Sequence, residues 1–76
     1  MAEPSIDVHL SDLTERQKQV VHLVLEGLTN AQIGARLRIK EESVKSQMTE
    51  ILRKAGKRNR TELAAWALEQ GAKPTS

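Results

Sequence analysis

The chain has 76 residues, no cysteine and a formal net charge of +2, which is enough for one small domain. Without cysteine it has neither disulfides nor thiolate ligands, and two histidines alone do not favour a zinc site, so no metal or other cofactor is expected. No apolar run is long enough to span a bilayer, and the N-terminus lacks the plan of a signal peptide. We therefore expect a cytoplasmic protein with no membrane partner.

Residues 1–12 carry one proline and scattered polar residues, with Ile6, Val8 and Leu10 in an alternation too short to define a strand. We expect a flexible arm or the end of an interdomain linker, with Val8 or Leu10 packed against the domain. His9 lies in this arm and is expected to have no chemical role.

The first predicted helix covers about residues 15–26. Thr14 and Gln17 have the spacing of a capping box, which satisfies free N–H groups at a helix start, and Gly27 suits a helix end. The run between these signals is largely apolar and contains His22. We interpret His22 as a partly buried packing residue and not as a ligand or a catalyst.

The second predicted helix, residues 30–37, begins with the same capping-box spacing at Thr29 and Gln32. Gly34 lowers the helix propensity by roughly 1 kcal/mol relative to alanine, and close approach of another helix is one reason to accept that cost. The residues expected to face inward are Ala31, Ile33, Gly34 and Leu37.

The third predicted helix, about residues 41–54, follows a turn at residues 38–40 in which Ile39 is expected to fill the corner. Lys40 offers no oxygen that can cap the helix start. Helical spacing defines an apolar stripe that faces inward. Its members are Val44, Met48, Ile51, Leu52 and Ala55.

The fourth predicted helix covers about residues 60–70 and begins with a cap pair at Asn59 and Glu62. The residues expected to pack on the first and third helices are Leu63, Ala64, Ala67 and Leu68. Residues 72–76 are expected to form a disordered tail. The sequence thus predicts an all-α fold, a compact four-helix helix-turn-helix domain over residues 13–71.

Basic residues are concentrated in one part of the chain. The stretch Arg36–Arg60 holds nine basic and three acidic residues, a net charge of +6, so the remainder of the chain carries −4. A surface that neutralises phosphates gains affinity by releasing counterions. This uneven distribution favours a nucleic acid as the partner.

A short helix joined to a longer helix by about three residues can place the second helix in the major groove of double-stranded DNA. The N-terminal half of such a helix reaches deepest, so base contacts are expected from Lys45, Ser46 and Thr49. Phosphate contacts are expected from Asn30, Gln32, Gln47, Arg53, Lys54, Lys57, Arg58 and Arg60. The alternative is an ordinary solvated face, because any amphipathic helix exposes polar side chains.

Four segments resemble the LuxR/FixJ-type (GerE-like) helix-turn-helix domain of bacterial transcription regulators. They are Leu13–Gln17, Gly27–Ile33, Ser43–Lys45 and Asn59–Leu63. The resemblance covers about residues 11–71, with the motifs in the family's order. It implies that the third helix reads the major groove, with Lys45, Ser46 and Thr49 at base-contacting positions, and that the fourth helix mediates dimerisation.

The sequence departs from this family at four positions. The family usually has Ser or Thr at Lys40, Ala at Gly34, His at Gln47 and Leu at Ala55. None of these changes removes the fold. Together they leave two possibilities open, a low affinity for DNA or a surface that binds a protein instead.

Trp66 is the only aromatic residue, and it lies beside the apolar stripe of the fourth helix. One interpretation places it at the edge of the core. The other makes it an exposed anchor at a twofold dimer interface, since tryptophan is common at interface hot spots. The interface would then consist of Ala65, Trp66, Leu68 and Glu69.

The sequence contains no nucleophile–base pair, metal cluster or glycine-rich phosphate loop, so an enzyme is not expected. The first hypothesis is a bacterial transcription regulator, or its DNA-binding domain, that binds specific duplex DNA as a homodimer. The alternative is a small protein-interaction module that binds another regulator or RNA polymerase. A third hypothesis, a promoter-recognition region like that of sigma factors, is disfavoured by the segment Asn59–Leu63 and the fourth helix.

Overall fold

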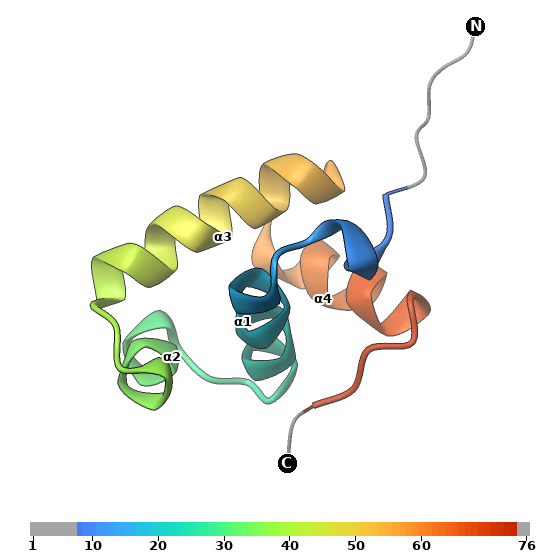
Figure 1. Ribbon diagram of the computed structural model, residues 1–76. Coiled ribbons are helices and arrows are strands. Elements are labelled where there is room, and N and C mark those ends of the chain that lie inside the picture. The colour runs from blue at the N-terminus through green and yellow to red at the C-terminus, as the bar shows by residue number, and fades with distance from the viewer. Residues whose placement is uncertain (1–7, 75–76) are drawn as a thin grey trace, which may run out of the picture.

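The computed structural model describes residues 8–74, which form four α-helices after a short 3-10 helix at Leu10–Asp12 (Figure 1). The helices are α1 (Glu15–Leu25), α2 (Asn30–Leu37), α3 (Glu41–Ala55) and α4 (Arg60–Glu69). The described part of the chain contains no strand. Each helix starts at the predicted residue and ends within one residue of its predicted end, which confirms the all-α fold.

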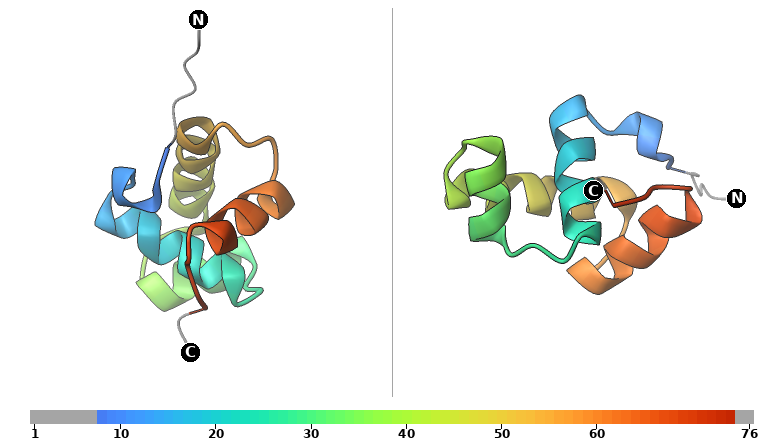
Figure 2. Two further views of the ribbon diagram at one scale, coloured as in Figure 1. Left: turned by 90° about the vertical axis from the view of Figure 1, so that its right-hand side faces the viewer. Right: turned by 90° about the horizontal axis from the view of Figure 1, so that it is seen from below.

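Helix α3 lies along one edge of the domain, and the other three helices lie on the same side of it (Figures 1 and 2). Helix α2 packs against α3, α4 contacts both α1 and α3, and α1 contacts all three other helices. The long side of α3 that faces away from the domain is therefore left uncovered within residues 8–74. None of the helices described there is both long and apolar enough to cross a membrane.

Two capping boxes fix the starts of α1 and α2. The Oγ1 atom of Thr14 accepts from the Gln17 N–H, and Oε1 of Gln17 accepts from the Thr14 N–H, both at 3.1 Å. Thr29 and Gln32 form the same reciprocal pair at 3.2 and 2.8 Å. Both predicted capping boxes are confirmed, and each satisfies two N–H groups that the helix leaves free.

The starts of α3 and α4 are capped less completely. Lys40 has the extended backbone of a cap residue but makes no side-chain capping bond, as the sequence predicted. Asn59 Oδ1 accepts from the Glu62 N–H at 2.9 Å. The Glu62 carboxylate does not return the bond to Asn59 but accepts from the Arg58 N–H at 2.8 Å.

The turn between α2 and α3 folds back on the last turn of α2. Arg38 adopts the left-handed conformation, with φ 61° and ψ 43°, and the Ile39 N–H donates to the Gly34 carbonyl at 2.9 Å. A Cβ atom on Gly34 would lie 2.7 Å from the Ile39 carbonyl oxygen. The predicted close approach at Gly34 is therefore present. Its nearest partner is the turn backbone, and the backbone nitrogen of Glu41, the first residue of α3, would lie 3.4 Å from the same Cβ.

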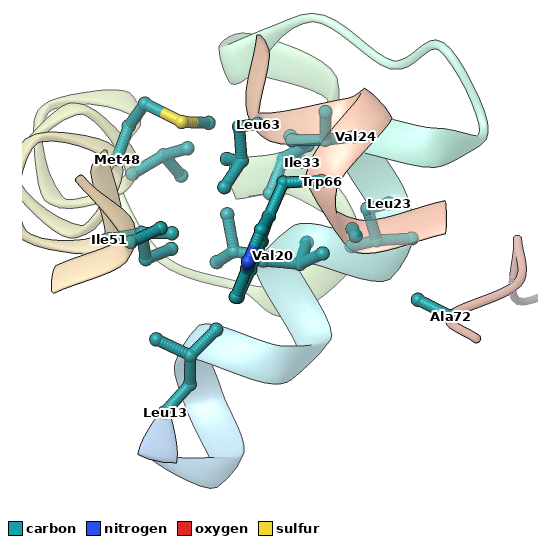
Figure 3. Close-up of a cluster of buried hydrophobic side chains, with 14 residues drawn as sticks. Leu13, Val20, Leu23, Val24, Ile33, Met48, Ile51, Leu63, Trp66 and Ala72 are labelled. Atoms are coloured by element: carbon teal, nitrogen blue, oxygen red, sulfur yellow. The ribbon is translucent and has the colours of Figure 1, made fainter. Parts of the chain in front are cut away.

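The core is formed by apolar side chains from all four helices (Figure 3). The stripe of α3 lies inward as predicted: Val44, Met48, Ile51 and Ala55 are buried, and Leu52 packs partly against the core. In α2, Ile33 and Gly34 are buried and Leu37 is half-buried. Ala31 is exposed, so its predicted inward position is wrong.

Trp66 belongs to the core, with only 8% of its surface exposed (Figure 3). The interpretation that placed it at the core is confirmed, and the exposed-anchor interpretation is wrong. Leu63 and Ala67 are buried beside it on α4, whereas Leu68 is 56% exposed and does not pack inward as predicted. An α-helix has 3.6 residues per turn, so when residues 63, 66 and 67 face the core, Leu68 lies on the opposite side of the helix.

Both ends of the described chain pack near the end of α4. Val8 and Leu10 pack against the core, as predicted, and His9 Nδ1 lies 3.1 Å from Oε1 of Gln70. Ala72 is buried, and its N–H donates to the Ala67 carbonyl at 2.9 Å. The predicted disordered tail over residues 72–76 is therefore wrong at Ala72, because the chain turns back over α4 there.

His22, on α1, holds the segment that follows Ala72. Its side chain is half-buried, as predicted, and Nδ1 lies 2.6 Å from the backbone oxygen of Lys73. The rest of the expected arm, residues 1–7, and residues 75–76 of the expected tail lie outside the described residues.

Candidate nucleic-acid interface

The uncovered side of α3 carries the three residues expected to contact bases. Lys45, Ser46 and Thr49 are all exposed. They share one face of the helix because Thr49 lies about one turn after both Lys45 and Ser46, and these two neighbours differ in direction by about 100°. The buried residues Val44 and Met48 fix that orientation from the opposite side. The structure thus brings these three side chains together on a surface that a groove can receive.

Thr49 also makes a hydrogen bond within α3. Its hydroxyl donates to the Lys45 carbonyl oxygen, four residues earlier, at 3.1 Å. The proton of the hydroxyl is therefore used inside the helix. In this conformation Thr49 offers a methyl group and oxygen lone pairs to a ligand.

Two arginines expected to contact phosphates already have carboxylate partners. Arg53 pairs with Glu50, one turn earlier on α3. Arg58 pairs with Glu62 at 3.2 Å, and its own side chain is 86% exposed. Exposed ion pairs of this kind are weakly stabilising, so a phosphate can replace either carboxylate at small cost.

The pKa of Glu62 is lowered by hydrogen bonds from Arg58. The backbone N–H of Arg58 donates to one carboxylate oxygen, and the Arg58 guanidinium donates to the other. The backbone bond, then the side-chain bond, holds the pKa of Glu62 below its ordinary value. The ionised carboxylate of Glu62 therefore binds both the backbone and the side chain of Arg58, in the basic loop between α3 and α4.

Lys54 is directed into the domain more than the sequence indicated. Its side chain is half-buried, and Nζ donates to Oε1 of Gln17 at 3.0 Å. Gln17 is itself 4% exposed, and the same oxygen accepts from the Thr14 N–H. Lys54 thus links the C-terminal half of α3 to the start of α1, and its remaining donors are left for solvent or a phosphate.

Arg60 is held by the segment that leads into α2. Its guanidinium donates to the Leu28 carbonyl oxygen and, at 3.0 Å, to Oδ1 of Asn30. The side chain is half-buried. The structure therefore joins two residues that the sequence assigned separately to phosphates, Asn30 and Arg60.

The remaining residues expected to contact phosphates differ in their exposure and in their free hydrogen-bonding groups. Gln32 is exposed, but its Oε1 is used in the capping box of α2. Gln47 is half-buried on the flank of α3, and Lys57 is half-buried in the loop after it. Within residues 8–74, the side chains of Gln47 and Lys57 make no hydrogen bond or ion pair to another residue.

Two residues that support side chains of the candidate interface were missed from the sequence. Gln17 supports Lys54, and the Leu28 carbonyl supports Arg60. The capping box already accounted for Gln17, and a backbone carbonyl carries no side-chain signal. Neither could be identified without knowing which helices lie side by side.

The outward face of α4 is small. Ala65, Leu68 and Glu69 are exposed, and Leu68 is the only large hydrophobic residue that is exposed among those the structure describes. Trp66, expected beside them, lies in the core. Thr61 is exposed as well, so α4 presents these three residues and Thr61 to a partner.

The short α2, the tight turn and the uncovered α3 define a helix-turn-helix domain. The profile of the family described as bacterial regulatory proteins, luxR family, matches residues 11–67. The chain therefore belongs to the luxR family of bacterial regulatory proteins.

Several curated proteins are similar to this chain. It is 40% identical over 60 residues to the DNA-binding transcriptional activator DevR/DosR of Mycobacterium tuberculosis and to the nitrate/nitrite response regulator protein NarP of Escherichia coli. In both cases the match covers 79% of this chain and 28% of the relative. The two-component response regulator PprB of Pseudomonas aeruginosa is 42% identical over 64 residues, 79% of this chain and 23% of that protein. The chain thus spans less than a third of the length of these relatives.

Proposed function

We propose that this domain recognises a specific sequence of double-stranded DNA by placing α3 in the major groove. The observation that carries the proposal is the uncovered face of α3, on which Lys45, Ser46 and Thr49 lie together and exposed. An α-helix fits the major groove, where each base pair presents a distinct pattern of donors and acceptors. Because DNA in bacteria lies in the cytoplasm, the domain is proposed to act there.

The three exposed residues are suited to different base edges. The ammonium group of Lys45 donates to O6 and N7 of guanine. The Thr49 methyl contacts the methyl group of thymine, a role supported by the internal bond that its hydroxyl makes to Lys45. Ser46 can donate or accept, so it is the least selective of the three.

Phosphate contacts surround this face and fix the position of α3. We assign them to Asn30 and Gln32 at the start of α2, where free N–H groups add to the attraction for an anion. On α3 and the following loop we assign them to Gln47, Arg53, Lys54, Lys57 and Arg58. Arg60 also lies in this region, but its guanidinium is engaged by protein acceptors.

We further propose that the domain binds DNA as a homodimer through α4. The exposed surface that includes Ala65, Leu68 and Glu69 lies on α4 and not on α3. Two copies can therefore associate through α4 while the α3 helix of each copy faces the DNA. A twofold axis would then place two half-sites about one helical turn apart on an inverted repeat. Leu68 would supply the apolar contact, with Trp66 supporting it from within the core.

The experiment is selection of duplexes from a random-sequence library with the 76-residue chain, followed by affinity measurements on the selected sequence. Lys45→Ala should weaken binding by about 1 to 3 kcal/mol and relax the preference at one base pair. Lys57→Ala is the matched control, because it removes a cation outside α3. It should weaken binding to all sequences alike and lower the salt dependence by about one phosphate contact.

Equal binding to every duplex, with no effect of Lys45→Ala, would contradict sequence-specific reading. The alternative partners, RNA polymerase or another regulator, would then be tested by the same two variants. If the face of α3 binds a protein, Lys45→Ala should weaken that complex and Lys57→Ala should not alter its specificity.

A further inference from the structure

Arg60 connects α4 to the entrance of α2 across thirty residues of sequence. It is the first residue of α4, and Asn30 is the first residue of α2. One nitrogen of the guanidinium donates to Oδ1 of Asn30 at 3.0 Å, and another donates to the Leu28 carbonyl oxygen. A planar fork with fixed donors can satisfy two acceptors at once, which a lysine ammonium on a flexible stem does less well.

The bond to Asn30 decides what that side chain can offer. With Oδ1 accepting from Arg60, the amide orientation is set and the Asn30 NH₂ group remains as the donor. A phosphate oxygen accepts only, so the NH₂ group is the end of the amide that a DNA backbone requires. If the amide turned over, it would present its oxygen to the phosphate and repel it.

The bond to Leu28 fixes the backbone at the same place. Leu28 precedes the cap residue Thr29, and the capping box satisfies the N–H groups of Thr29 and Gln32. The N–H groups of Asn30 and Ala31 belong to the same first turn, where an α-helix supplies no partner for them. Arg60 therefore holds both the side chain and the backbone donors of the α2 start in one orientation.

We infer that Arg60 is a positioning residue for DNA binding, which orients the Asn30 amide and the start of α2 toward a phosphate and does not itself neutralise one. The inference rests on the proposed DNA-binding function. It replaces the phosphate contact predicted for Arg60 from the sequence. Arg60 also connects α4, the helix proposed for dimerisation, to α2, the helix proposed to contact the DNA backbone.

The two roles differ in what a substitution must preserve. A phosphate contact requires the positive charge, so Arg60→Lys should keep most of the affinity. A positioning residue requires the two-pronged geometry, so Arg60→Lys and Arg60→Met should both lose roughly tenfold in affinity for the selected duplex. Lys57→Arg and Lys57→Met are the matched controls. Of these, Lys57→Arg should bind like the unchanged chain.

Salt dependence separates the roles independently. The slope of log K against log salt falls by about 0.9 for each phosphate that a lysine or arginine no longer neutralises, and a neutral amide contact does not contribute to it. It should fall by that amount for Lys57→Met and stay unchanged for Arg60→Met. Asn30→Ala should weaken binding by itself, and it should add little to the loss in an Arg60→Met background, because both changes remove the same contact.

Nuclear magnetic resonance of the free protein provides a readout that does not depend on DNA. The Asn30 side-chain amide signals should move and become averaged in Arg60→Lys, while the corresponding signals of Asn59 stay in place. If an Arg60 variant does not fold, Asn30→Ala retains Arg60 and still tests the same contact through DNA affinity.

The inference is overturned if Arg60→Lys binds like the unchanged chain while Arg60→Met loses one phosphate contact in the salt slope. It is equally overturned if Asn30→Ala has no effect on affinity. Absence of any sequence-selective duplex for the unchanged chain would instead contradict the proposed function, and the Asn30 amide signals would still report whether Arg60 orients that side chain.

Discussion

The ammonium group of Lys54 lies 3.0 Å from Oε1 of Gln17, which is the only polar residue buried among those the structure describes. The same oxygen accepts from the Thr14 N–H. One atom therefore closes the capping box of α1 and secures the C-terminal half of α3. The position of α3, the helix proposed to enter the major groove, therefore depends on the start of α1, which has no expected contact with DNA.

Gln17→Ala should lower the free energy of unfolding by about 1 to 2 kcal/mol. It removes the acceptor for Lys54 and for a helix-terminal N–H group. Gln32→Ala is the matched control, because Gln32 makes the same capping bond on α2 but is exposed and receives no lysine. It should cost about 0.5 kcal/mol. Urea denaturation followed by circular dichroism measures both, and equal losses would exclude a structural role for the Lys54 bond.

Lys40→Ser should stabilise the domain by about 1 kcal/mol. Lys40 already has the extended backbone of a cap residue and lacks only an oxygen that can accept from the first turn of α3. For a domain of this size the midpoint of thermal unfolding should rise by roughly 4 to 8 °C. Lys40→Ala controls for loss of the lysine, and an equal rise in that variant would attribute the gain to charge removal instead of capping.

Glu62 should contribute a pH-dependent part of the stability. Its pKa is lower in the folded chain than its ordinary value of 4.5, because the ionised form accepts bonds from Arg58. The contribution is therefore fully present above the ordinary value and is lost as the pH falls through the lowered pKa of the folded state. Thermal unfolding of Glu62→Gln should show a weaker loss of stability in that acidic range.

The source of the lowered Glu62 pKa can be tested with Arg58→Ala. The backbone N–H of Arg58 is the larger cause and survives the substitution, so the Glu62 pKa should rise only part of the way to its ordinary value. A carboxyl titration by nuclear magnetic resonance measures this. Complete return to the ordinary value would mean that the guanidinium alone causes the shift.

Leu68→Glu should reduce self-association and leave the fold intact. Leu68 is 56% exposed, so the substitution should change the free energy of unfolding by no more than about 0.5 kcal/mol. Trp66→Ala, two residues earlier, should instead cost about 3 to 5 kcal/mol, because it empties a buried position. Sedimentation and urea denaturation measure the two effects. Unchanged association of Leu68→Glu would contradict a dimer built on this face of α4.

The positions of the helices could be predicted from the residues because the signals are local. The capping boxes at Thr14 and Thr29 involve residues three positions apart, and the inward stripe of α3 repeats at helical spacing. Such interactions form within one or two turns and do not depend on which helix packs against which. The exposed base-reading candidates followed from the same periodicity, because burying Val44 and Met48 turns Lys45 and Thr49 outward.

Most of the contacts that were wrong or missed join residues distant in sequence; the Gly34 contact is with a turn only five residues further on. Trp66 is buried because α4 packs on α1 and α3, and Gly34 is required by the carbonyl of a turn whose path depends on the left-handed Arg38. Lys54 and Arg60 look like any surface cations until Gln17 and Asn30 are placed beside them. Periodicity tells which side of a helix is apolar, but the acceptor that a long cationic side chain reaches is set by the packing of the helices in three dimensions.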